Sequence, residues 1–189
     1  MKIICIGRNY VDHIKELNNE INEEPVVFMK PETALPLRDF PFFYPSFSND
    51  VQHEIEIVLK ICKTGKNISE KFAHKYFEEI TAGIDFTARD LQTRLKAKGL
   101  PWELAKAFDG SAIVGKFLNK ESLGDLKHIT FSLKVNDVVK QEGDTSLMLF
   151  SFDRIISFVS KYITLKKGDL IFTGTPKGVG PVQINDQLK

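Results

Sequence analysis

The segment 51–59 alternates between two kinds of side chain, and this alternation constrains the fold more than any other feature of the chain. Glu54 and Glu56 share one face of the predicted strand, while Ile55 and Ile57 share the other. On a strand, residues two apart have Cα atoms roughly 6.5–7 Å apart, so both carboxylates can reach one ion. On a helix, the same spacing would point them to nearly opposite sides. The segment therefore predicts a strand with two convergent carboxylates.

Two anions that face one pocket repel each other, so at neutral pH they need a cation or a shared proton. Asp85, within the segment 83–90, offers a third carboxylate further along the chain. Ligation by Glu54, Glu56 and Asp85 would be entirely through oxygen, which suits Mg²⁺ or Mn²⁺ better than Zn²⁺. The alternative is an ordinary strand whose two glutamates face solvent.

Length and composition indicate one soluble globular domain. The chain has 189 residues, of which 42% are hydrophobic and 27% charged, with a net charge of +1. Because there is no long basic block, we expect neither nucleic acid nor an anionic membrane as a partner. Cys5 and Cys62 are too few for a disulfide scaffold, and we interpret both as small buried residues. The apolar N-terminal run is too short for a signal peptide, so we expect a cytoplasmic protein.

The pattern of strands and short helices predicts an α+β fold rather than regular βαβ winding. Ser69 resembles the N-cap of an amphipathic helix, and Thr87 with Asp90 resembles a capping box for a helix that Gly99 would end. Asn136 and Asp137 would form the turn of a hairpin. The expected strands cover residues 2–6, 51–61, 81–86, 129–135, 138–141 and 170–172, and the expected helices cover 11–17, 69–80, 87–98 and 151–163.

Arg89 and Gln92 follow Asp85 in the first turns of a predicted helix and are three residues apart, hence on one face. The free N–H groups and the positive end of the helix dipole favour an anion there. A small carboxylate that also chelates the ion would fit between these groups. The alternative is a capped helix with a solvated Arg89.

His13 and Glu16 are also three residues apart, so a helix would bring the imidazole and the carboxylate together. A carboxylate bonded to one ring nitrogen raises the basicity of the other, as a general base requires. Pairs with this spacing are frequent on ordinary helix surfaces, which is the alternative interpretation.

Lys30 and Lys106 stand in unusually apolar surroundings. Each would either extend to water or face an anionic pocket. The run 173–180 is rich in Gly and Thr but lacks the Gly-Lys-Ser/Thr ending of a phosphate-binding loop. Its N–H groups and hydroxyls can bind a carboxylate, or the run is only a tight turn.

Seven short motifs, in this order, resemble the fumarylacetoacetate hydrolase family across nearly the whole chain. No single motif is decisive, but the seven together are specific. They are Gly7-Arg8-Asn9-Tyr10, Phe28-Met29-Lys30-Pro31, His53-Glu54-Ile55-Glu56, Asp85-Phe86-Thr87-Ala88-Arg89-Asp90, Gly99-Leu100-Pro101-Trp102, Gln141-Glu142-Gly143 and Thr173-Gly174-Thr175-Pro176-Lys177-Gly178-Val179-Gly180.

The resemblance implies a β-rich mixed roll that forms a single catalytic domain over 1–189, a homodimer, and a Mg²⁺ or Mn²⁺ ion. It also implies a mobile lid at about 8–22. The chain ends at Lys189, where family members usually continue through another strand, so we expect an incomplete edge of the sheet. The implied site residues are Glu54, Glu56 and Asp85 on the metal, His13, Glu16 and Lys106 in catalysis, and Lys30, Arg89, Gln92 and Thr175 on the substrate.

Within the family, the chain most resembles the branch of acylpyruvate hydrolases and oxaloacetate decarboxylases. We therefore expect cleavage of a C–C bond in a small 2-keto acid. One alternative is a 2-hydroxyhepta-2,4-diene-1,7-dioate isomerase or a related decarboxylase of aromatic degradation. Another is a non-catalytic β domain that holds a structural ion, although such a domain would have no use for the His13–Glu16 dyad.

Overall fold

A mixed seven-stranded sheet forms the centre of the computed structural model, which describes residues 1–17, 22–36 and 40–189. The strand order is β2-β1-β11-β4-β5-β7, with β8 also beside β5. β1 and β11 are parallel, and every other pairing in this sheet is antiparallel. The strands are β1 (Ile3–Gly7), β2 (Val26–Lys30), β4 (Ile55–Ile61), β5 (Phe77–Asp85), β7 (Ala112–Val114), β8 (Leu118–Asn119) and β11 (Leu170–Phe172).

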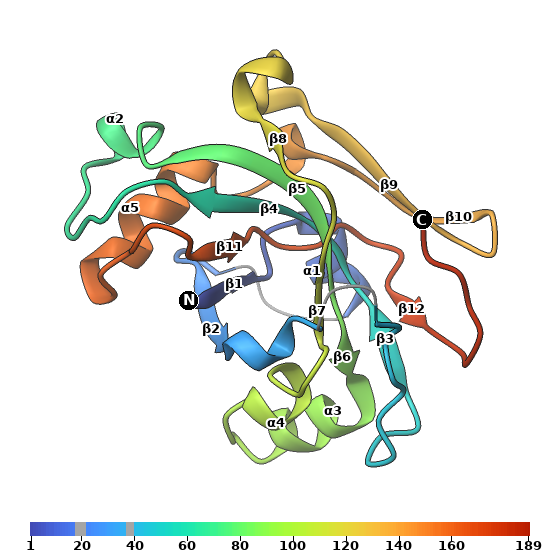
Figure 1. Ribbon diagram of the computed structural model, residues 1–189. Coiled ribbons are helices and arrows are strands. Elements are labelled where there is room, and N and C mark those ends of the chain that lie inside the picture. Colours follow the sequence, from blue (N-terminus) through green and yellow to red (C-terminus); the bar gives the residue numbers. More distant parts are fainter. Residues whose placement is uncertain (18–21, 37–39) are drawn as a thin grey trace.

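The strand alternation divides the core into two layers, one on each face of this sheet. On one face, Ile57 and Leu59 of β4 pack in the same cluster as Ile155 and Ile156 of α5 (Phe152–Tyr162). The short helix α2 (Glu70–Ala73) lies beside α5 (Figure 1). On the other face, Val58 belongs to a smaller cluster. Burial of one such side chain stabilises the fold by about 1.5–3 kcal/mol.

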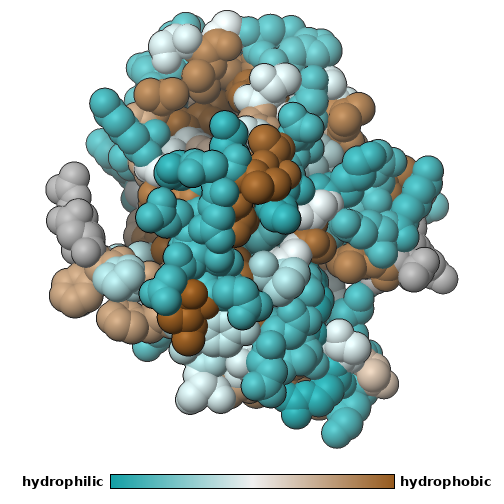
Figure 2. Space-filling view, turned by 90° about the vertical axis from the view of Figure 1, so that its right-hand side faces the viewer, coloured by the Kyte–Doolittle hydropathy of each residue, from teal (hydrophilic) through white to brown (hydrophobic). Residues whose placement is uncertain are grey.

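Two smaller sheets extend the structure beyond the central one. β3 (Val51–His53) pairs on one side with β12 (Gly180–Pro181) and on the other with β6 (Thr87–Ala88), while β9 (Thr130–Val135) and β10 (Val138–Asp144) form a hairpin. The remaining helices are α1 (Val11–Glu16), α3 (Arg89–Ala97) and α4 (Glu103–Lys106), with 3₁₀ turns at Glu32–Ala34, Lys120–Ser122, Leu126–His128 and Thr145–Leu147. The face seen in Figure 2 is mainly hydrophilic, with apolar side chains in separate spots. None of the helices in the described part of the chain is long and apolar enough to cross a membrane.

Several local predictions are confirmed. Asn136 and Asp137 have φ values of 50° and 65° in the two-residue turn between β9 and β10, as a tight hairpin requires. Gly99, with a φ of +63°, ends α3 by donating its N–H to the carbonyl of Lys96. The helix expected over residues 151–163 is α5, and Ser151 precedes it as its N-cap residue and accepts a hydrogen bond from the Arg154 N–H at 3.2 Å.

The prediction of a helix over residues 69–80 is wrong. The helix stops at Ala73, and the chain enters β5 at Phe77. Ile80 pairs with Leu59 of β4 and is buried on the sheet. The helical spacing of aromatic residues here is outweighed by a long antiparallel pairing, which satisfies the backbone and buries alternate side chains.

The predicted capping box of Thr87 and Asp90 is also wrong. Thr87 lies in β6, one residue before the N-cap position of α3, and its hydroxyl donates to Glu54 at 3.1 Å. Asp90 instead accepts hydrogen bonds from the Ser48 hydroxyl and the Asn49 N–H. Both side chains are therefore used in tertiary contacts, which local spacing does not reveal.

Gly83 on β5 gives a test of this packing. A Cβ at Gly83 would lie 2.7 Å from the carbonyl oxygen of Ile113 and 2.7 Å from a methyl group of Val58. We expect Gly83→Ala to lower the free energy of unfolding by about 1–3 kcal/mol, because the backbone cannot yield without distorting the sheet. Urea denaturation measures this loss. Gly180→Ala is the control, since its Cβ would meet nothing closer than 3.5 Å, and an equal loss in both variants would contradict the argument.

Candidate active site

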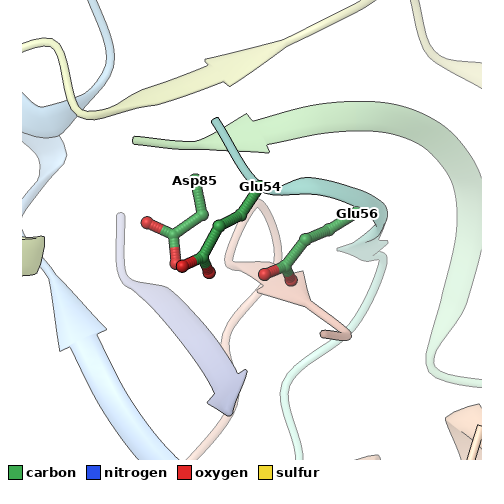
Figure 3. Close-up of side chains that lie close together, drawn as sticks. All are labelled: Glu54, Glu56 and Asp85. Carbon is green, nitrogen blue, oxygen red and sulfur yellow. The ribbon is translucent and has the colours of Figure 1, made fainter. Parts of the chain in front are cut away.

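Three buried carboxylates meet where the central sheet joins the smaller sheet of β3, β6 and β12. Glu54 lies between β3 and β4, Glu56 lies in β4, and Asp85 ends β5. The Asp85 N–H donates to the Glu54 carbonyl at 2.8 Å, so the strand pairing sets these two residues side by side. One oxygen from each carboxylate lies within 4.8 Å of the others (Figure 3). The alternative of glutamates that face solvent is therefore wrong.

Lysine side chains balance part of this negative charge. Lys106 in α4 places Nζ 2.8 Å from Glu54 and 2.8 Å from Asp85, and it also donates to the Thr87 hydroxyl. Burial lowers the pKa of Lys106, but Asp85 and Glu54 outweigh this effect and raise the pKa overall. Lys30 lies 2.7 Å from the other oxygen of Asp85. Lys106 is thus held in its charged form by the carboxylates that it contacts.

Glu54 and Glu56 have opposite electrostatic environments. Burial opposes ionisation of Glu54, but Lys106 and Arg89 outweigh it and hold the pKa well below its usual range. The pKa of Glu56 is raised, chiefly by burial and then by the neighbouring charges of Asp85 and Glu54. Within the described part of the chain, Glu56 accepts one hydrogen bond, from the Gly174 N–H at 2.7 Å. Glu56 is therefore the carboxylate that most needs a further cation or a proton.

This donor set fits a divalent metal ion. All three candidate ligands are carboxylates, which favours a hard cation with oxygen ligands. Glu56 is only 2% exposed, and within the described part of the chain it has one backbone hydrogen bond and no ion pair. Buried carboxylate oxygens without full hydrogen bonding are costly unless a cation compensates them. Glu54, Glu56 and Asp85 can thus hold a divalent ion.

The predicted dyad is formed by α1, and its His13 lines a cavity that Glu54 and Glu56 also line. His13 Nδ1 lies 3.0 Å from Glu16, and the other carboxylate oxygen of Glu16 accepts the Gly178 N–H at 2.9 Å. The Gly-rich run thereby fixes the residue that orients the imidazole. His13 is only 6% exposed, which is inconsistent with an ordinary surface pair.

The cavity brings most of the predicted site residues together. It has about 40 Å³ of space that water can occupy, room for a few water molecules. Gln92 accepts a hydrogen bond from Arg89 at 2.6 Å, and Arg89 also pairs with Glu54. The predicted residues that line the cavity are His13, Glu54, Glu56, Arg89, Gln92, Lys106 and Thr175.

Lys30 does not line this cavity, so its assignment as a substrate contact is corrected. Its ammonium group lies behind Asp85 and donates to the Ser111 hydroxyl at 3.0 Å and to backbone carbonyls. The side chain is fully buried. Lys30 therefore supports Asp85 from the side away from the cavity.

Sequence reasoning assigned no role to Gln141, although this residue organises the site. Its side-chain oxygen accepts hydrogen bonds from the Ile55 N–H and the His53 ring, and its amide donates to Thr175 and to the Pro176 carbonyl. Burial lowers the pKa of His53, which favours the neutral ring. The motif Gln141-Glu142-Gly143 marked the position, but only the fold shows that it joins the metal-ligand strand to the Gly-rich run.

The chain is similar to known proteins of one family. The family model described as fumarylacetoacetate (FAA) hydrolase C-terminal matches residues 2–189. The mouse oxaloacetate tautomerase FAHD1, mitochondrial, is 46% identical over 187 residues, covering 99% of this chain and 85% of that protein. The mitochondrial oxaloacetate decarboxylase of Dictyostelium discoideum is 40% identical over 189 residues, covering 100% of this chain and 87% of that protein.

A solved structure extends the likeness to the fold. The fumarylpyruvate hydrolase of Pseudomonas aeruginosa in complex with Mn²⁺ and pyruvate superposes with a TM-score of 0.91 at 35% identity, covering 100% of this chain and 83% of that one. Fold and site together define a metal-dependent enzyme with a small cavity beside the carboxylate cluster. The chain belongs to the fumarylacetoacetate hydrolase family.

The raised pKa of Glu56 leads to a prediction with two opposite signs. In metal-free protein at neutral pH, Glu56→Gln should raise the free energy of unfolding, because folding then has neither to bury an anion beside two others nor to protonate it. The same change should weaken Mn²⁺ binding at least about tenfold, since even supporting residues of metal sites have effects of this size. Chemical denaturation with chelator and calorimetric Mn²⁺ titration measure the two effects.

Glu79→Gln is the matched control for this prediction. Glu79 lies on β5 and pairs with Lys60 at the surface, far less buried than Glu56. Its loss should leave Mn²⁺ affinity unchanged. Glu56→Gln protein that binds Mn²⁺ as tightly as the wild type would remove Glu56 from the ligand set.

Proposed function

We propose that this protein is a Mg²⁺- or Mn²⁺-dependent enzyme that cleaves a C–C bond in small 2-keto acids, by acylpyruvate hydrolysis, oxaloacetate decarboxylation or both. The observation that carries the proposal is the buried His13, which Glu16 orients and which lines the same cavity as Glu54 and Glu56 of the carboxylate cluster. A structural ion would need no such base. The printed names of relatives, an oxaloacetate decarboxylase and a fumarylpyruvate hydrolase with Mn²⁺ and pyruvate, support the same chemistry.

The residues of the cavity divide the work of substrate binding. A bound divalent ion would supply Lewis acidity toward the keto oxygen and the adjacent carboxylate of the substrate. Arg89, Gln92 and Thr175 line the same cavity and offer N–H and O–H donors to that carboxylate. In this structure Arg89 pairs with Glu54, and Lys106 pairs with Glu54 and Asp85. If a divalent ion balanced these carboxylates, Arg89 and Lys106 would become available to substrate.

For hydrolysis, His13 would accept a proton from water, which then attacks the carbonyl distal to the 2-keto acid. Glu16 stabilises the imidazolium that forms, because it accepts the hydrogen bond from Nδ1. The adduct breaks its C–C bond, and the electron pair passes to the pyruvate fragment as its enolate. Lys106 would stabilise the developing negative charge from within a buried site, where such a contribution is large. Decarboxylation needs the same stabilisation but no attacking water.

Tautomerisation of oxaloacetate is the second candidate. It needs only a base that moves a proton between the carbon and the oxygen of the keto–enol pair, and His13 in the cavity is such a base. The name of the mouse relative supports this candidate. The isomerase of heptadienedioates remains a further alternative, because it would use the same base and the same carboxylates.

The lid is proposed from the contacts of α1. Besides the bond from Gly178 to Glu16, Lys177 pairs with Asp12 at 3.2 Å, and the pair is exposed. Residues 18–21 of the predicted lid lie outside the described part of the chain. We propose that α1 breaks these contacts and moves away from the cavity to admit substrate, as gating segments commonly do. A homodimer and a cytoplasmic location stay predictions, and light scattering tests the first.

A substrate screen tests the proposed activity directly. Acetylpyruvate, fumarylpyruvate and oxaloacetate should be assayed with Mg²⁺, with Mn²⁺ and with chelator. We expect turnover of at least one of them only with a divalent ion, and enolisation of oxaloacetate is followed separately by its ultraviolet absorbance. Failure with all three substrates, in protein that binds Mn²⁺, would contradict the proposal.

The dyad gives the sharper prediction. We expect His13→Ala to lower the rate of acylpyruvate hydrolysis by a factor of roughly 10²–10⁴, the usual contribution of a general base. Oxalate should still bind to the Mn²⁺-loaded variant, because it needs no base. His74→Ala is the control, since His74 is exposed on the far side of the central sheet beside α2. A His13→Ala enzyme at full rate would remove the dyad from the mechanism.

A further inference from the structure

The cavity carries two further cationic side chains that the proposed reaction does not use. Arg8 follows β1, and Lys96 lies in the last turn of α3, and both line the cavity together with His13 and Arg89. The acidic residues among the described cavity lining are Glu54 and Glu56, which belong to the metal end. Arg8 and Lys96 therefore add positive charge at another part of the wall.

The length of α3 separates the charge of Lys96 from the metal end of the cavity. Arg89, which contacts Glu54, stands at the first position of the helix, and Lys96 stands seven residues later. At 1.5 Å per residue, their backbones are roughly 10 Å apart along the helix axis. Burial, and then the charges of Arg8 and Arg89, lower the pKa of Lys96, which shows that Arg8 and Lys96 are electrostatic neighbours.

Arg8 is held in an unfavourable backbone conformation. Its φ is +59°, in the left-handed region that glycine occupies without strain and other residues occupy at a cost. Gly7 precedes it with ordinary backbone geometry. Among the described residues, Arg8 has one hydrogen-bond partner, the Asn22 side chain at 3.1 Å. An arginine is thus placed where glycine would fold more easily, in the lining of the cavity.

An apolar wall joins the two charged parts of the cavity. Phe28 and Trp102 both line it, with ring centroids 6.0 Å apart. The Lys106 ammonium lies 5.2 Å from the centre of the Phe28 ring, so this wall begins at the metal end. A Cβ on Gly7, the residue before Arg8, would lie 3.7 Å from Trp102, so the wall also reaches the neighbourhood of Arg8. A ligand with a short carbon chain between two anionic groups would fit this arrangement. One anion would lie at the metal end, the chain against Phe28 and Trp102, and the other anion near Arg8.

We propose that Arg8, assisted by Lys96, binds the second carboxylate of a dicarboxylic 2-keto acid and so makes the enzyme prefer dicarboxylic over monocarboxylic substrates. This inference rests on the proposed function, because it takes the first carboxylate to be held at the metal end. A guanidinium group suits the role, since it can donate two parallel hydrogen bonds to one carboxylate.

A matched pair of unreactive ligands tests the proposal without turnover. 2-Oxoglutarate and 2-oxopentanoate have the same length and the same 2-keto acid end, but only the first has a distal carboxylate. Each is titrated calorimetrically into Mn²⁺-loaded protein. We expect wild-type protein to bind 2-oxoglutarate at least about tenfold more tightly, as one charge-assisted pair of hydrogen bonds provides.

Two variants of Arg8 carry the test. Arg8→Gln removes the charge and keeps a polar side chain, whereas Arg8→Gly also relieves the left-handed backbone, so it should fold at least as well as the wild type. Both should reduce the preference for 2-oxoglutarate to about twofold or less. Arg94→Gln is the control, because Arg94 is an exposed arginine on α3 and does not line this cavity.

Equal affinities of wild-type protein for the two ligands would overturn the proposal, and so would an unchanged preference in both Arg8 variants. These results are independent of the proposed function. Protein that prefers 2-oxoglutarate through Arg8 but turns over no acylpyruvate or oxaloacetate would retain the carboxylate subsite and lose the proposed reaction. Turnover without any effect of Arg8 on ligand preference would retain the reaction and lose the subsite.

Discussion

The pairing of β4 with β5 is the constraint on which the rest of the site depends. It sets Ile55 opposite Ile84, and the next hydrogen bond along, from the Asp85 N–H to the Glu54 carbonyl, brings two acids together in a dry interior. Each ion removed from water costs several kcal/mol unless it is compensated. The neighbouring cations Lys30, Lys106 and Arg89 are therefore requirements of the fold as much as parts of a reaction.

The cations compensate the three carboxylates unequally, and this inequality leaves a place for a further cation. Among the described residues, Glu54 and Asp85 have lysine partners, whereas Glu56 has one backbone hydrogen bond and a raised pKa. A divalent ion would relieve this imbalance and release Lys106 toward substrate. An uncompensated buried carboxylate lowers the stability of the metal-free protein, and the same carboxylate would raise its affinity for a divalent ion.

The Gly-rich run joins the carboxylate cluster to the proposed base, His13. The Gly174 N–H donates a hydrogen bond to Glu56, and the Gly178 N–H donates one to Glu16 of the dyad. Between them, the Thr175 hydroxyl accepts a hydrogen bond from the Gln141 side chain. Gly178 has a φ of +95°, and a side chain there would collide with the Lys140 carbonyl, so the run can approach β10 only as glycine. One loop thus positions groups from α1, β4 and β10.

Local spacing by itself determined much of this protein. The alternation around Glu54 and Glu56, the three-residue spacing of His13 and Glu16, and the turn at Asn136 are short-range patterns with short-range geometric consequences. Tertiary structure decided the rest. It turned the end of the expected helix 69–80 into β5, because pairing with β4 outweighs helical propensity. It also placed Lys30 behind Asp85 and made Gln141 a link between distant segments, because such contacts depend on which strands become neighbours.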